Sequence, residues 1–576
     1  MLITGAELFV KALKAEQVNT LFAYPGGQAI DLFNALYGEN DIDVILPRHE
    51  QGLVHAADGY ARSTGKVGVC LVTSGPGATN LVTGIATANY DSVPLVCFTG
   101  QVPTGLIGND AFQEVDIVGI TRSICKYAVT VRNRDELAAT IKKAFYIART
   151  GKPGVVVVDL PKDIQREYGS DEYPEKIEIR GYKPKLSVHA GQIKKALETL
   201  NNAKKPVFLI GGGVNISHAQ SEMLKLAELT GVPVITTIMG KGVIPTTHDL
   251  YIGNIGIHGS YAANTAISNC DVLFSIGTRF NDRITGKMGH FATHATIIHV
   301  DIDSASISRN IEVDIPIVAD AKLAISALLE KAQALNTGDW LAQIDRWKKQ
   351  YPLSMKATGM TPEKIIRQIN KIFESAIIAT DVGQNQLWAT QFLELSGKKQ
   401  MLTSGGLGTM GYGFPAAIGA KIGNPSQDVI VISGDGGMQM NIQEMATAIC
   451  YELPITICIF NNGYLGNVRQ WQEMFFDKRY SSTCMRYRKS CINSCNSPTE
   501  CCPPYTPDFI KLAESYGAKG IRVSEESEIS VALKTAKDTL KVPTVIEFII
   551  EREENVMPIV PPGNSLEDMI LESEDN

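Results

Sequence analysis

Residues 428–462, DVIVISGDGGMQMNIQEMATAICYELPITICIFNN, decide the fold of this 576-residue chain. The run DVIVIS (428–433) is short, apolar and rich in β-branched residues, and it stops at GDGG (434–437). The following stretch places apolar residues at helical spacing, and PITICIF (454–460) is a second apolar run that ends at two asparagines. A strand, a helix and a strand with nearly continuous apolar strands are typical of a right-handed crossover in a parallel sheet.

This crossover is expected to bring Asp435 and Asn462 to the carboxyl ends of two parallel strands, where open α/β sheets bind ligands. A carboxylate, an amide oxygen and nearby backbone carbonyls form an all-oxygen set, which suits a hydrated Mg²⁺ that also binds phosphate. GDGG taken alone is better explained as a strand-ending turn, because Gly and Asp are common turn residues. The crossover spacing and the asparagine pair together favour a metal-bridged diphosphate as the ligand.

The composition is that of an ordinary globular protein, because 44% of the residues are hydrophobic and 20% are charged. The net charge of −7 and the lack of a long basic run argue against nucleic acid as a partner. No uninterrupted apolar stretch reaches the roughly 18 residues of a membrane span, so we expect no membrane association. The N-terminus resembles neither a signal peptide nor a transit peptide, and we therefore expect a cytoplasmic location.

The length predicts about three to four domains. Apolar runs alternate with helical patterns in three successive blocks, and Gly- and Pro-rich loops close the strands. The expected fold class is α/β, with three doubly wound parallel-sheet domains. The expected boundaries are 1–163, 190–338 and 361–550, followed by a Pro-rich, charged tail over 551–576.

The GDGG turn followed by the asparagine pair resembles the diphosphate-anchoring motif of thiamine diphosphate enzymes. The resemblance implies that Asp435, Asn462 and the backbone carbonyl of Tyr464 complete a Mg²⁺ site. It also makes the first domain pyrimidine-binding and the third domain diphosphate-binding. The glycines expected to contact the cofactor are Gly434, Gly436 and Gly437.

Glu50 follows the run DVILP near the start of an Ala-rich helix, where this family has its activating glutamate. A carboxylate in the first turn of a helix often only complements the helix dipole or caps the helix. The family's chemistry instead needs a buried carboxyl group that shares a proton with the aminopyrimidine N1′. The resulting imino tautomer removes the thiazolium C2 proton.

Other glycine-rich strand ends carry further expected cofactor contacts. By resemblance, Pro76 and Asn80 in SGPGATN lie near the pyrimidine ring, and Gln384 in DVGQNQLW meets the diphosphate. Met410 becomes the apolar wedge that bends the cofactor, although a buried Met is more often simple core filling.

GTRFNDRITG (277–286) narrows the family. Together with AFQE (111–114), IHGS (257–260), VRQWQ (468–472) and VMPIVPPG (556–563), it resembles acetohydroxyacid synthase. That family binds FAD in a Rossmann-like central domain without net redox use, and GGG at 211–213 suits an ADP-like group although GxGxxG is not matched. The expected FAD contacts are Gly211, Gly212, Gly213, Arg279 and Asp301.

The same resemblance assigns substrate roles. Arg283 would hold the carboxylate of the second 2-ketoacid, because a guanidinium fork matches a carboxylate, although a surface ion pair is the alternative. Gln113, Gly27 and Lys162 are expected in catalytic roles. The remaining residues of the acceptor pocket and access channel are Val102, Pro103, Ala111, Phe112 and Trp471. Asn467 borders this pocket where the family usually has Met, and Asn281 replaces a usual Asp.

The implied activity is a carboligase that condenses two 2-ketoacids with loss of CO₂, the first common step of branched-chain amino-acid biosynthesis. Two pyruvates would give 2-acetolactate, and pyruvate with 2-ketobutyrate would give 2-aceto-2-hydroxybutyrate. A pyruvate oxidase or decarboxylase of the same family stays open, as does a non-catalytic flavin or metal sensor. Arg283 and Trp471 favour the ligase, and intact Glu50, Asp435 and Asn462 argue against the sensor.

The resemblance also implies assembly. Glu50 and the Mg²⁺ site lie in different domains and are expected to meet across the interface of a homodimer, which can form part of a tetramer. A separate regulatory small subunit is also expected, as in the family.

Five of the 11 cysteines cluster in a segment, 484–504, that is an insertion relative to the family. In a cytoplasmic protein such a cluster favours metal ligation over disulfides. The spacing matches neither a standard zinc site nor a ferredoxin, so Zn²⁺, an iron–sulfur cluster and a reduced loop without a ligand all stay open. We expect Cys-to-Ser changes at 491 and 495 to alter metal content and turnover. The five are Cys484, Cys491, Cys495, Cys501 and Cys502.

Overall fold

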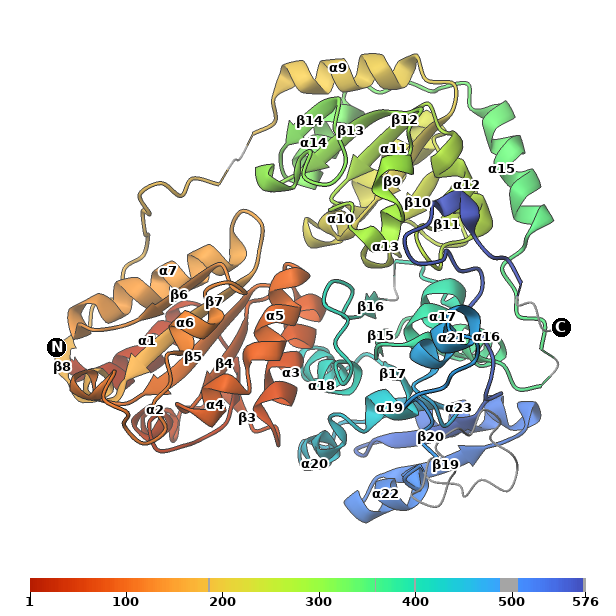
Figure 1. The fold of residues 1–576 in the computed structure, drawn as a ribbon. Helices are drawn as coiled ribbons and strands as arrows, with labels where there is room; N and C mark the ends of the chain where they lie inside the picture. The colour runs from red at the N-terminus through yellow and green to blue at the C-terminus, as the bar shows by residue number, and fades with distance from the viewer. Residues whose placement is uncertain (185–186, 358, 398–399, 487–505, 573–576) are drawn as a thin grey trace.

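The computed structural model describes residues 1–184, 187–357, 359–397, 400–486 and 506–572. Over these residues the chain forms three α/β domains, each built on a six-stranded parallel sheet (Figure 1). The expected fold class is confirmed. Among the described residues, none of the helices has the length and apolar character needed to cross a membrane.

The N-terminal sheet has the strand order β3-β2-β4-β5-β7-β6. A short antiparallel pair, β1 (Leu2–Thr4) with β8 (Tyr168–Ser170), lies beside it. The strands of the six-stranded sheet are β2 (Thr20–Ala23), β3 (Asp43–Ile45), β4 (Gly68–Val72), β5 (Leu95–Gln101), β6 (Tyr127–Thr130) and β7 (Val155–Pro161). The α-helices of this domain are α1 (Gly5–Ala15), α2 (Ile30–Leu36), α3 (Glu50–Thr64), α4 (Pro76–Thr79), α5 (Val82–Tyr90), α6 (Ile117–Thr121), α7 (Leu137–Arg149) and α8 (Lys162–Arg166).

The middle sheet has the strand order β11-β10-β9-β12-β13-β14. Its strands are β9 (Pro206–Ile210), β10 (Val234–Thr236), β11 (Tyr251–Asn254), β12 (Val272–Ile276), β13 (Thr296–Asp301) and β14 (Ile315–Val318). The α-helices are α9 (Ala190–Asn201), α10 (Gly212–Ile216), α11 (Gln220–Thr230), α12 (Tyr261–Asn269), α13 (Asp282–Thr285), α14 (Ala321–Leu329) and α15 (Gly338–Gln350).

The C-terminal sheet has the strand order β16-β15-β17-β18-β20-β19. Its strands are β15 (Ile377–Thr380), β16 (Gln400–Leu402), β17 (Val429–Gly434), β18 (Ile455–Asn461), β19 (Lys519–Val523) and β20 (Thr544–Ile549). The α-helices are α16 (Pro362–Ile372), α17 (Gln384–Phe392), α18 (Gly413–Gly423), α19 (Asp435–Met438), α20 (Met445–Cys450), α21 (Gly466–Phe475), α22 (Phe509–Tyr516) and α23 (Ile529–Lys537).

Each sheet is covered by helices on both faces. Along β17, Ile430 and Ile432 belong to one buried apolar cluster, whereas Val429 and Val431 belong to another. Successive side chains of a strand point to opposite faces, so a strand buried on both faces must be apolar throughout. This explains the uninterrupted apolar runs of the sequence and confirms the parallel pairing of β17 with β18.

The helical pattern after GDGG forms less α-helix than the sequence predicts. α19 ends at Met438, a 3₁₀ turn covers Ile442–Glu444, and α20 begins only at Met445. The turn brings Glu444 to the N-terminal domain, where its carboxylate accepts backbone hydrogen bonds.

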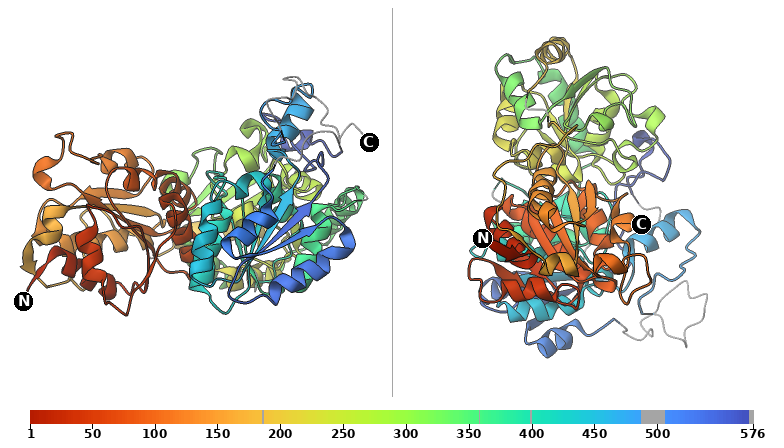
Figure 2. Two further views of the ribbon diagram at one scale, coloured as in Figure 1. Left: turned by 90° about the horizontal axis from the view of Figure 1, so that it is seen from below. Right: turned by 90° about the vertical axis from the view of Figure 1, so that its left-hand side faces the viewer.

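α3 and α18 join the N-terminal domain to the C-terminal domain (Figures 1 and 2). The two helices lie so close that a Cβ atom at Gly59 would collide with the carbonyl oxygen of Ala416. A Cβ atom at Gly419 would likewise collide with the carbonyl oxygen of Ala56. Glycine at these two positions therefore permits the close packing.

The chain after β20 returns to the middle domain. The Val560 N–H donates to the Ile257 carbonyl at 2.8 Å, and the Lys287 N–H donates to the Asn564 carbonyl at 2.9 Å. This segment connects the carboxyl end of β20 to the loops around Arg283.

Candidate functional site

The carboxyl ends of the central strands β17 and β18 lie side by side at the same end of the C-terminal sheet. Gly434 pairs with Phe460, so the GDGG turn and the asparagine pair are neighbours. A pocket at this end, here named the Asp435 pocket, collects residues expected from the sequence to hold the cofactor. Those residues are Gln384, Met410, Gly434, Asp435, Gly436, Gly437, Asn462 and Tyr464.

Asp435 has the properties of a cation ligand. Burial, with a smaller contribution from the nearby charge of Glu547, raises its pKa to about 7. One carboxylate oxygen, Oδ2, is buried without a hydrogen-bond partner. Asn462 lines the same pocket and donates from Nδ2 to Gln384 Oε1 at 3.2 Å. A buried, unpartnered carboxylate oxygen beside an amide and backbone carbonyls fits Mg²⁺, whose charge would favour the ionised carboxylate.

Over the residues that the structure describes, no group of three or more His, Cys, Asp and Glu side chains could hold a metal ion. The Mg²⁺ fit therefore depends on one carboxylate supplemented by amide and carbonyl oxygens. This donor set matches the sequence expectation, and it suits an ion that keeps several of its ligands from water and phosphate.

Asp381 supports the Asp435 pocket, a role that no motif in the sequence predicts. Its buried carboxylate accepts hydrogen bonds from the Gly411 and Gly413 N–H groups, each at 3.0 Å. A Cβ atom at Gly437 would collide with Asp381 Oδ1. Asp381 therefore holds the chain on both sides of the pocket, and burial raises its pKa.

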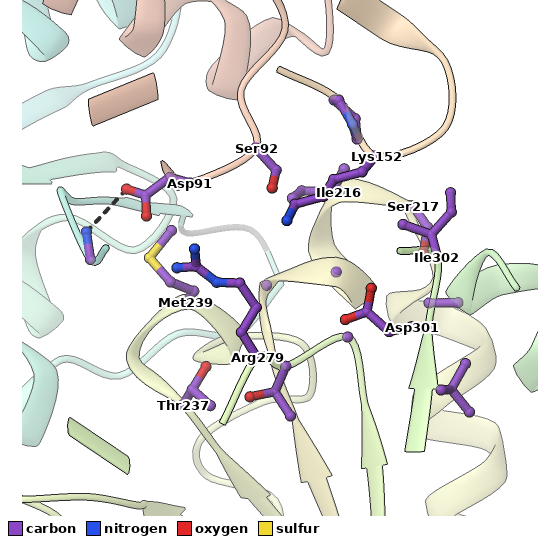
Figure 3. A pocket seen from close by; sticks show the side chains of 18 of the residues that line it. Asp91, Ser92, Lys152, Ile216, Ser217, Thr237, Met239, Arg279, Asp301 and Ile302 are labelled. Atoms are coloured by element: carbon purple, nitrogen blue, oxygen red, sulfur yellow. Dashed lines mark hydrogen bonds between the residues drawn. The ribbon is translucent and has the colours of Figure 1, made fainter. Parts of the chain in front are cut away.

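A second pocket lies where the three domains meet, and we name it the interdomain pocket (Figure 3). From the middle domain it is lined by Gly212, Gly213, Arg279, Arg283 and Asp301, all predicted from the sequence. The N-terminal domain adds Asp91 and Lys152, and the C-terminal domain adds Gly405. Cationic side chains, a carboxylate and glycine backbone suit a ligand with phosphates and hydroxyl groups, so the residues fit FAD.

Asp301 and Gly211 differ in their relation to this pocket. Burial raises the pKa of Asp301 to about 6, and the Asp303 N–H donates to its Oδ1 at 2.8 Å. Gly211 is not among the lining residues. A Cβ atom there would collide with the Gly277 carbonyl oxygen, so Gly211 permits close backbone packing beneath the pocket.

Glu50 begins α3 directly after the N-terminal cap at His49, in agreement with the predicted helix start. Asn80 donates from Nδ2 to Glu50 Oε2 at 2.9 Å. The other oxygen, Oε1, lies 3.5 Å from the position of a Cβ atom at Gly77. The SGPGATN loop therefore orients the Glu50 carboxyl group through Asn80.

Glu444 fixes the start of α3 from the C-terminal domain. Its carboxylate accepts hydrogen bonds from the Arg48 N–H at 3.1 Å and the His49 N–H at 3.0 Å, the two residues before Glu50. A Cβ atom at Gly52 would lie 2.5 Å from Glu444 Oε1. Sequence reasoning missed this residue, because its partners lie almost 400 positions away.

The other N-terminal site residues lie around the same loops. Lys162 donates from Nζ to the Gly27 carbonyl at 2.8 Å. Gln113 has a left-handed backbone with φ 59°, and its carbonyl oxygen lies 2.9 Å from the position of a Cβ atom at Gly75. Of the predicted channel residues, Val102 is buried, Pro103 and Ala111 are half-buried, and Phe112 is 84% exposed.

Arg283 and Trp471 lie together although they come from different domains. The Arg283 guanidinium is 5.8 Å from the centre of the Trp471 ring. Arg283 also lines the interdomain pocket, and its side chain is 59% exposed. Arg283 Nε forms a long surface ion pair with Asp282 Oδ2 at 3.7 Å, which leaves the terminal N–H groups of the guanidinium as donors for a carboxylate.

The single chain does not bring all predicted site residues together. The Asp435 pocket is lined only by residues of the C-terminal domain, and Glu50 and Phe112 are absent from its lining. The exposed Phe112 ring lies on the N-terminal domain, whereas its proposed pocket partner Trp471 lies on the C-terminal domain.

Cys484 is the one member of the predicted cysteine cluster within the described residues. Its backbone forms an antiparallel bridge with Tyr464, flanked by a hydrogen bond from the Met485 N–H to the Gly463 carbonyl at 2.9 Å. The insertion therefore begins at the edge of the Asp435 pocket. Cys491, Cys495, Cys501 and Cys502 lie outside the described residues.

Three family models match the chain. They are the thiamine pyrophosphate enzyme N-terminal TPP binding domain over residues 3–120, the central domain over 193–328 and the C-terminal TPP binding domain over 381–548. The N-terminal match includes Glu50 and Asn80, and the C-terminal match includes the whole Asp435 pocket.

The chain is also similar to curated proteins over nearly its whole length. It is 46% identical to a probable acetolactate synthase large subunit of Methanocaldococcus jannaschii, over 98% of this chain and 95% of the relative. It is 42% identical to an acetolactate synthase large subunit of Corynebacterium glutamicum, over 98% and 90%. The identity to acetolactate synthase isozyme 3 large subunit of Escherichia coli K12 is 41%, over 99% of each chain.

Proposed function

Because this chain belongs to the acetolactate synthase large-subunit family of thiamine pyrophosphate enzymes, we propose that it joins two 2-ketoacids with loss of CO₂. The donor is pyruvate, and the acceptor is a second pyruvate or 2-ketobutyrate. The products are 2-acetolactate and 2-aceto-2-hydroxybutyrate, intermediates of branched-chain amino-acid biosynthesis.

The pairing of Arg283 with Trp471 carries the choice of a ligase within the thiamine diphosphate enzymes. A decarboxylase or oxidase needs no site for the carboxylate of a second ketoacid. The Arg283 guanidinium provides several N–H donors for that carboxylate, and the Trp471 ring beside it provides an apolar wall for the acceptor side chain.

Thiamine diphosphate, when bound, supplies a nucleophilic carbon and an electron sink. Asp435, Asn462 and the Tyr464 carbonyl would hold Mg²⁺ against the diphosphate, and Gln384 would orient Asn462 through their hydrogen bond. Met410 would press on the cofactor from its position in the pocket wall. These residues would bind the metal and orient the cofactor, because Mg²⁺ requires oxygen ligands that are already in place.

Glu50 would hold the proton that activates the cofactor. Asn80 occupies Oε2, so Oε1 is the oxygen left for the aminopyrimidine nitrogen. A carboxyl group in this role works best when it is shielded from water and held in one orientation. Glu444, which binds the backbone before Glu50, would supply part of that fixed orientation.

We further propose FAD as the ligand of the interdomain pocket, with Arg279, Asp301, Gly212 and Gly213 as contacts. The active unit would be a homodimer, because Glu50 and the Asp435 pocket are separate within one chain and a second copy would bring them together. The relatives are named large subunits, which supports a regulatory small subunit as a partner of this chain as well.

Anaerobic incubation of the purified protein with ¹³C-pyruvate, thiamine diphosphate, Mg²⁺ and FAD tests this function, with products resolved by NMR. Acetolactate is the expected product. Acetaldehyde or acetate alone would place the chain with the decarboxylases or oxidases, and full cofactor binding without turnover would favour a sensor.

A further inference from the structure

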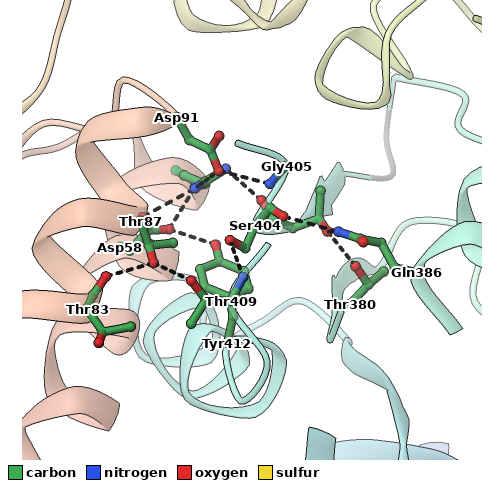
Figure 4. Close-up of polar contacts among 12 residues, drawn as sticks. Asp58, Thr83, Thr87, Asp91, Thr380, Gln386, Ser404, Gly405, Thr409 and Tyr412 are labelled. Atoms are coloured by element: carbon green, nitrogen blue, oxygen red, sulfur yellow. Dashed lines mark hydrogen bonds and ion pairs between the residues drawn. The ribbon is translucent and has the colours of Figure 1, made fainter. Parts of the chain in front are cut away.

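One segment of the C-terminal domain, Thr403–Tyr412, forms part of the wall of both pockets. Gly405 lines the interdomain pocket, and Met410 lines the Asp435 pocket only five residues later. Buried residues of the N-terminal domain hold this segment at both ends (Figure 4).

Asp91 and Arg62 bind the first end of the segment. Asp91 Oδ2 accepts hydrogen bonds from the Gly405 N–H at 3.1 Å and from Arg62 Nη2 at 3.0 Å. Arg62 Nη1 donates to the Thr403 carbonyl at 3.0 Å. Asp91 also lines the interdomain pocket, and its second oxygen, Oδ1, is buried without a hydrogen-bond partner. A ligand N–H or O–H group that reached this oxygen would supply its missing hydrogen bond.

The second end of the segment is held by the same network. Tyr412 donates from its hydroxyl group to Asp58 Oδ1 at 2.6 Å, and Arg62 Nε donates to the same oxygen at 2.6 Å. The hydroxyl groups of Thr87 and Thr409 are 2.7 Å apart. The chain Asp58–Arg62–Asp91 therefore connects Tyr412, two residues after Met410 of the Asp435 pocket, with Gly405 in the interdomain pocket.

We expect Asp58, Arg62 and Asp91 to move together with the segment that they bind. Two carboxylates share one guanidinium in a buried setting, so moving one partner leaves a charge that water cannot reach. Hydrogen bonds in such a chain strengthen one another. A ligand contact that fixes Asp91 would therefore also fix Arg62, Thr403 and the segment that follows.

We propose that Asp91 and Arg62 are positioning residues that couple the occupancy of the interdomain pocket to the placement of Met410 in the Asp435 pocket. The inference rests on the proposed function, in which FAD and thiamine diphosphate are the two ligands. Coupling between two binding sites is reciprocal, so each ligand must tighten the other by the same factor. A factor of about ten is expected, within the usual range for such coupling.

The test is calorimetric titration of the full-length protein. The Kd of thiamine diphosphate with Mg²⁺ is measured with and without saturating FAD, and the Kd of FAD is measured with and without thiamine diphosphate. The wild type should show equal tightening of roughly tenfold in both directions. Asp91→Asn keeps the size of the side chain but removes its charge, and the factor should fall to about one with each ligand still bound.

Asp301→Asn is the matched control. It alters another carboxylate of the interdomain pocket that has no contact with the segment, so it should weaken FAD binding but leave the coupling factor unchanged. Thr87→Val is a second variant of similar volume, which removes the contact to Thr409 and should also reduce the factor.

Two results would overturn the inference. One is a coupling factor of one in the wild type, and the other is wild-type coupling in both Asp91→Asn and Thr87→Val. These are distinguishable from failure of the proposed function, because a wild type that binds neither ligand refutes both proposals. A wild type that binds both ligands independently refutes only the coupling.

Discussion

The Arg283 guanidinium lies 5.8 Å from the centre of the Trp471 ring, although these residues come from the middle and C-terminal domains. The segment after β20 maintains this approach: Gln470 Nε2, beside Trp471, donates to the Val556 carbonyl at 3.0 Å. Further along, Val560 binds Ile257 in the middle domain. The acceptor site is therefore a product of domain packing.

Arg283→Ala should change the products more than the consumption of pyruvate. Loss of charge-assisted hydrogen bonds to the acceptor carboxylate should lower the rate of acetolactate formation by roughly 10- to 100-fold. Release of acetaldehyde should rise in its place, measured by NMR. Arg346→Ala on the exposed face of α15 is the control. An unchanged product ratio in Arg283→Ala would show that Arg283 does not bind the carboxylate of the acceptor.

Glu444→Gln should reduce turnover although Glu444 lies in a different domain from Glu50. The neutral amide accepts the Arg48 and His49 N–H groups more weakly, so the first turn of α3 is held less firmly. We expect turnover to fall roughly tenfold, with thiamine diphosphate still bound.

Glu452→Gln is the control for this change, because it removes a nearby carboxylate that only pairs with Lys541 on the surface. Equal turnover in the two variants would show that Glu444 has no role in positioning Glu50.

Asn467→Met should shift the preference between acceptors. Asn467 lines the Asp435 pocket, and its Oδ1 is buried without a hydrogen-bond partner. A Met side chain would replace this polar atom by apolar surface suited to the extra methylene group of 2-ketobutyrate. One methylene group is worth about 10-fold in discrimination, so the ratio of 2-aceto-2-hydroxybutyrate to acetolactate should rise by up to that factor. Competition between both acceptors in one tube measures the ratio; a lower ratio in the variant would contradict the assignment.

Asp159 gives a pH dependence of stability. Burial raises its pKa to about 6 from an ordinary 3.8, against the hydrogen bonds from Thr99, Gln101 and Thr130. A raised pKa in the folded state stabilises the fold below the unfolded pKa, and this contribution is lost as the pH rises through about 6. The loss is on the order of 3 kcal/mol between pH 4 and pH 6.

Thermal unfolding of the wild type and Asp159→Asn across this range provides the measurement. The midpoint of the wild type should fall relative to that of the variant as the pH rises, because Asn does not ionise. Parallel curves would mean that Asp159 titrates normally in the folded protein.

The parts of the site that the sequence predicts are those formed by local segments. Asp435 and Asn462 follow apolar strands that pair in parallel, and a strand end positions the next residue whatever the rest of the chain does. Glu50 likewise begins a helix immediately after a strand.

The missed residues act over long distances in sequence. Asp91 binds Gly405 from 314 positions away, and Glu444 binds His49 from 395 positions away. Nothing in the local pattern around an Asp or a Glu distinguishes such a partner from a surface carboxylate. The 3₁₀ turn at Ile442–Glu444 interrupts a helical pattern for the same reason, because Glu444 there contacts another domain.

Mixing two inactive variants tests the central claim, that two copies of this chain build one acetolactate-forming site. Glu50→Gln removes the proton-holding group, and Asp435→Ala removes a metal ligand, so each variant alone should make no acetolactate. After joint refolding or subunit exchange, a mixed dimer has one site with both residues intact, and acetolactate should appear in the NMR spectrum. A mixture as inactive as its components, with exchange verified by mass spectrometry, would show that Glu50 and Asp435 do not meet across two chains.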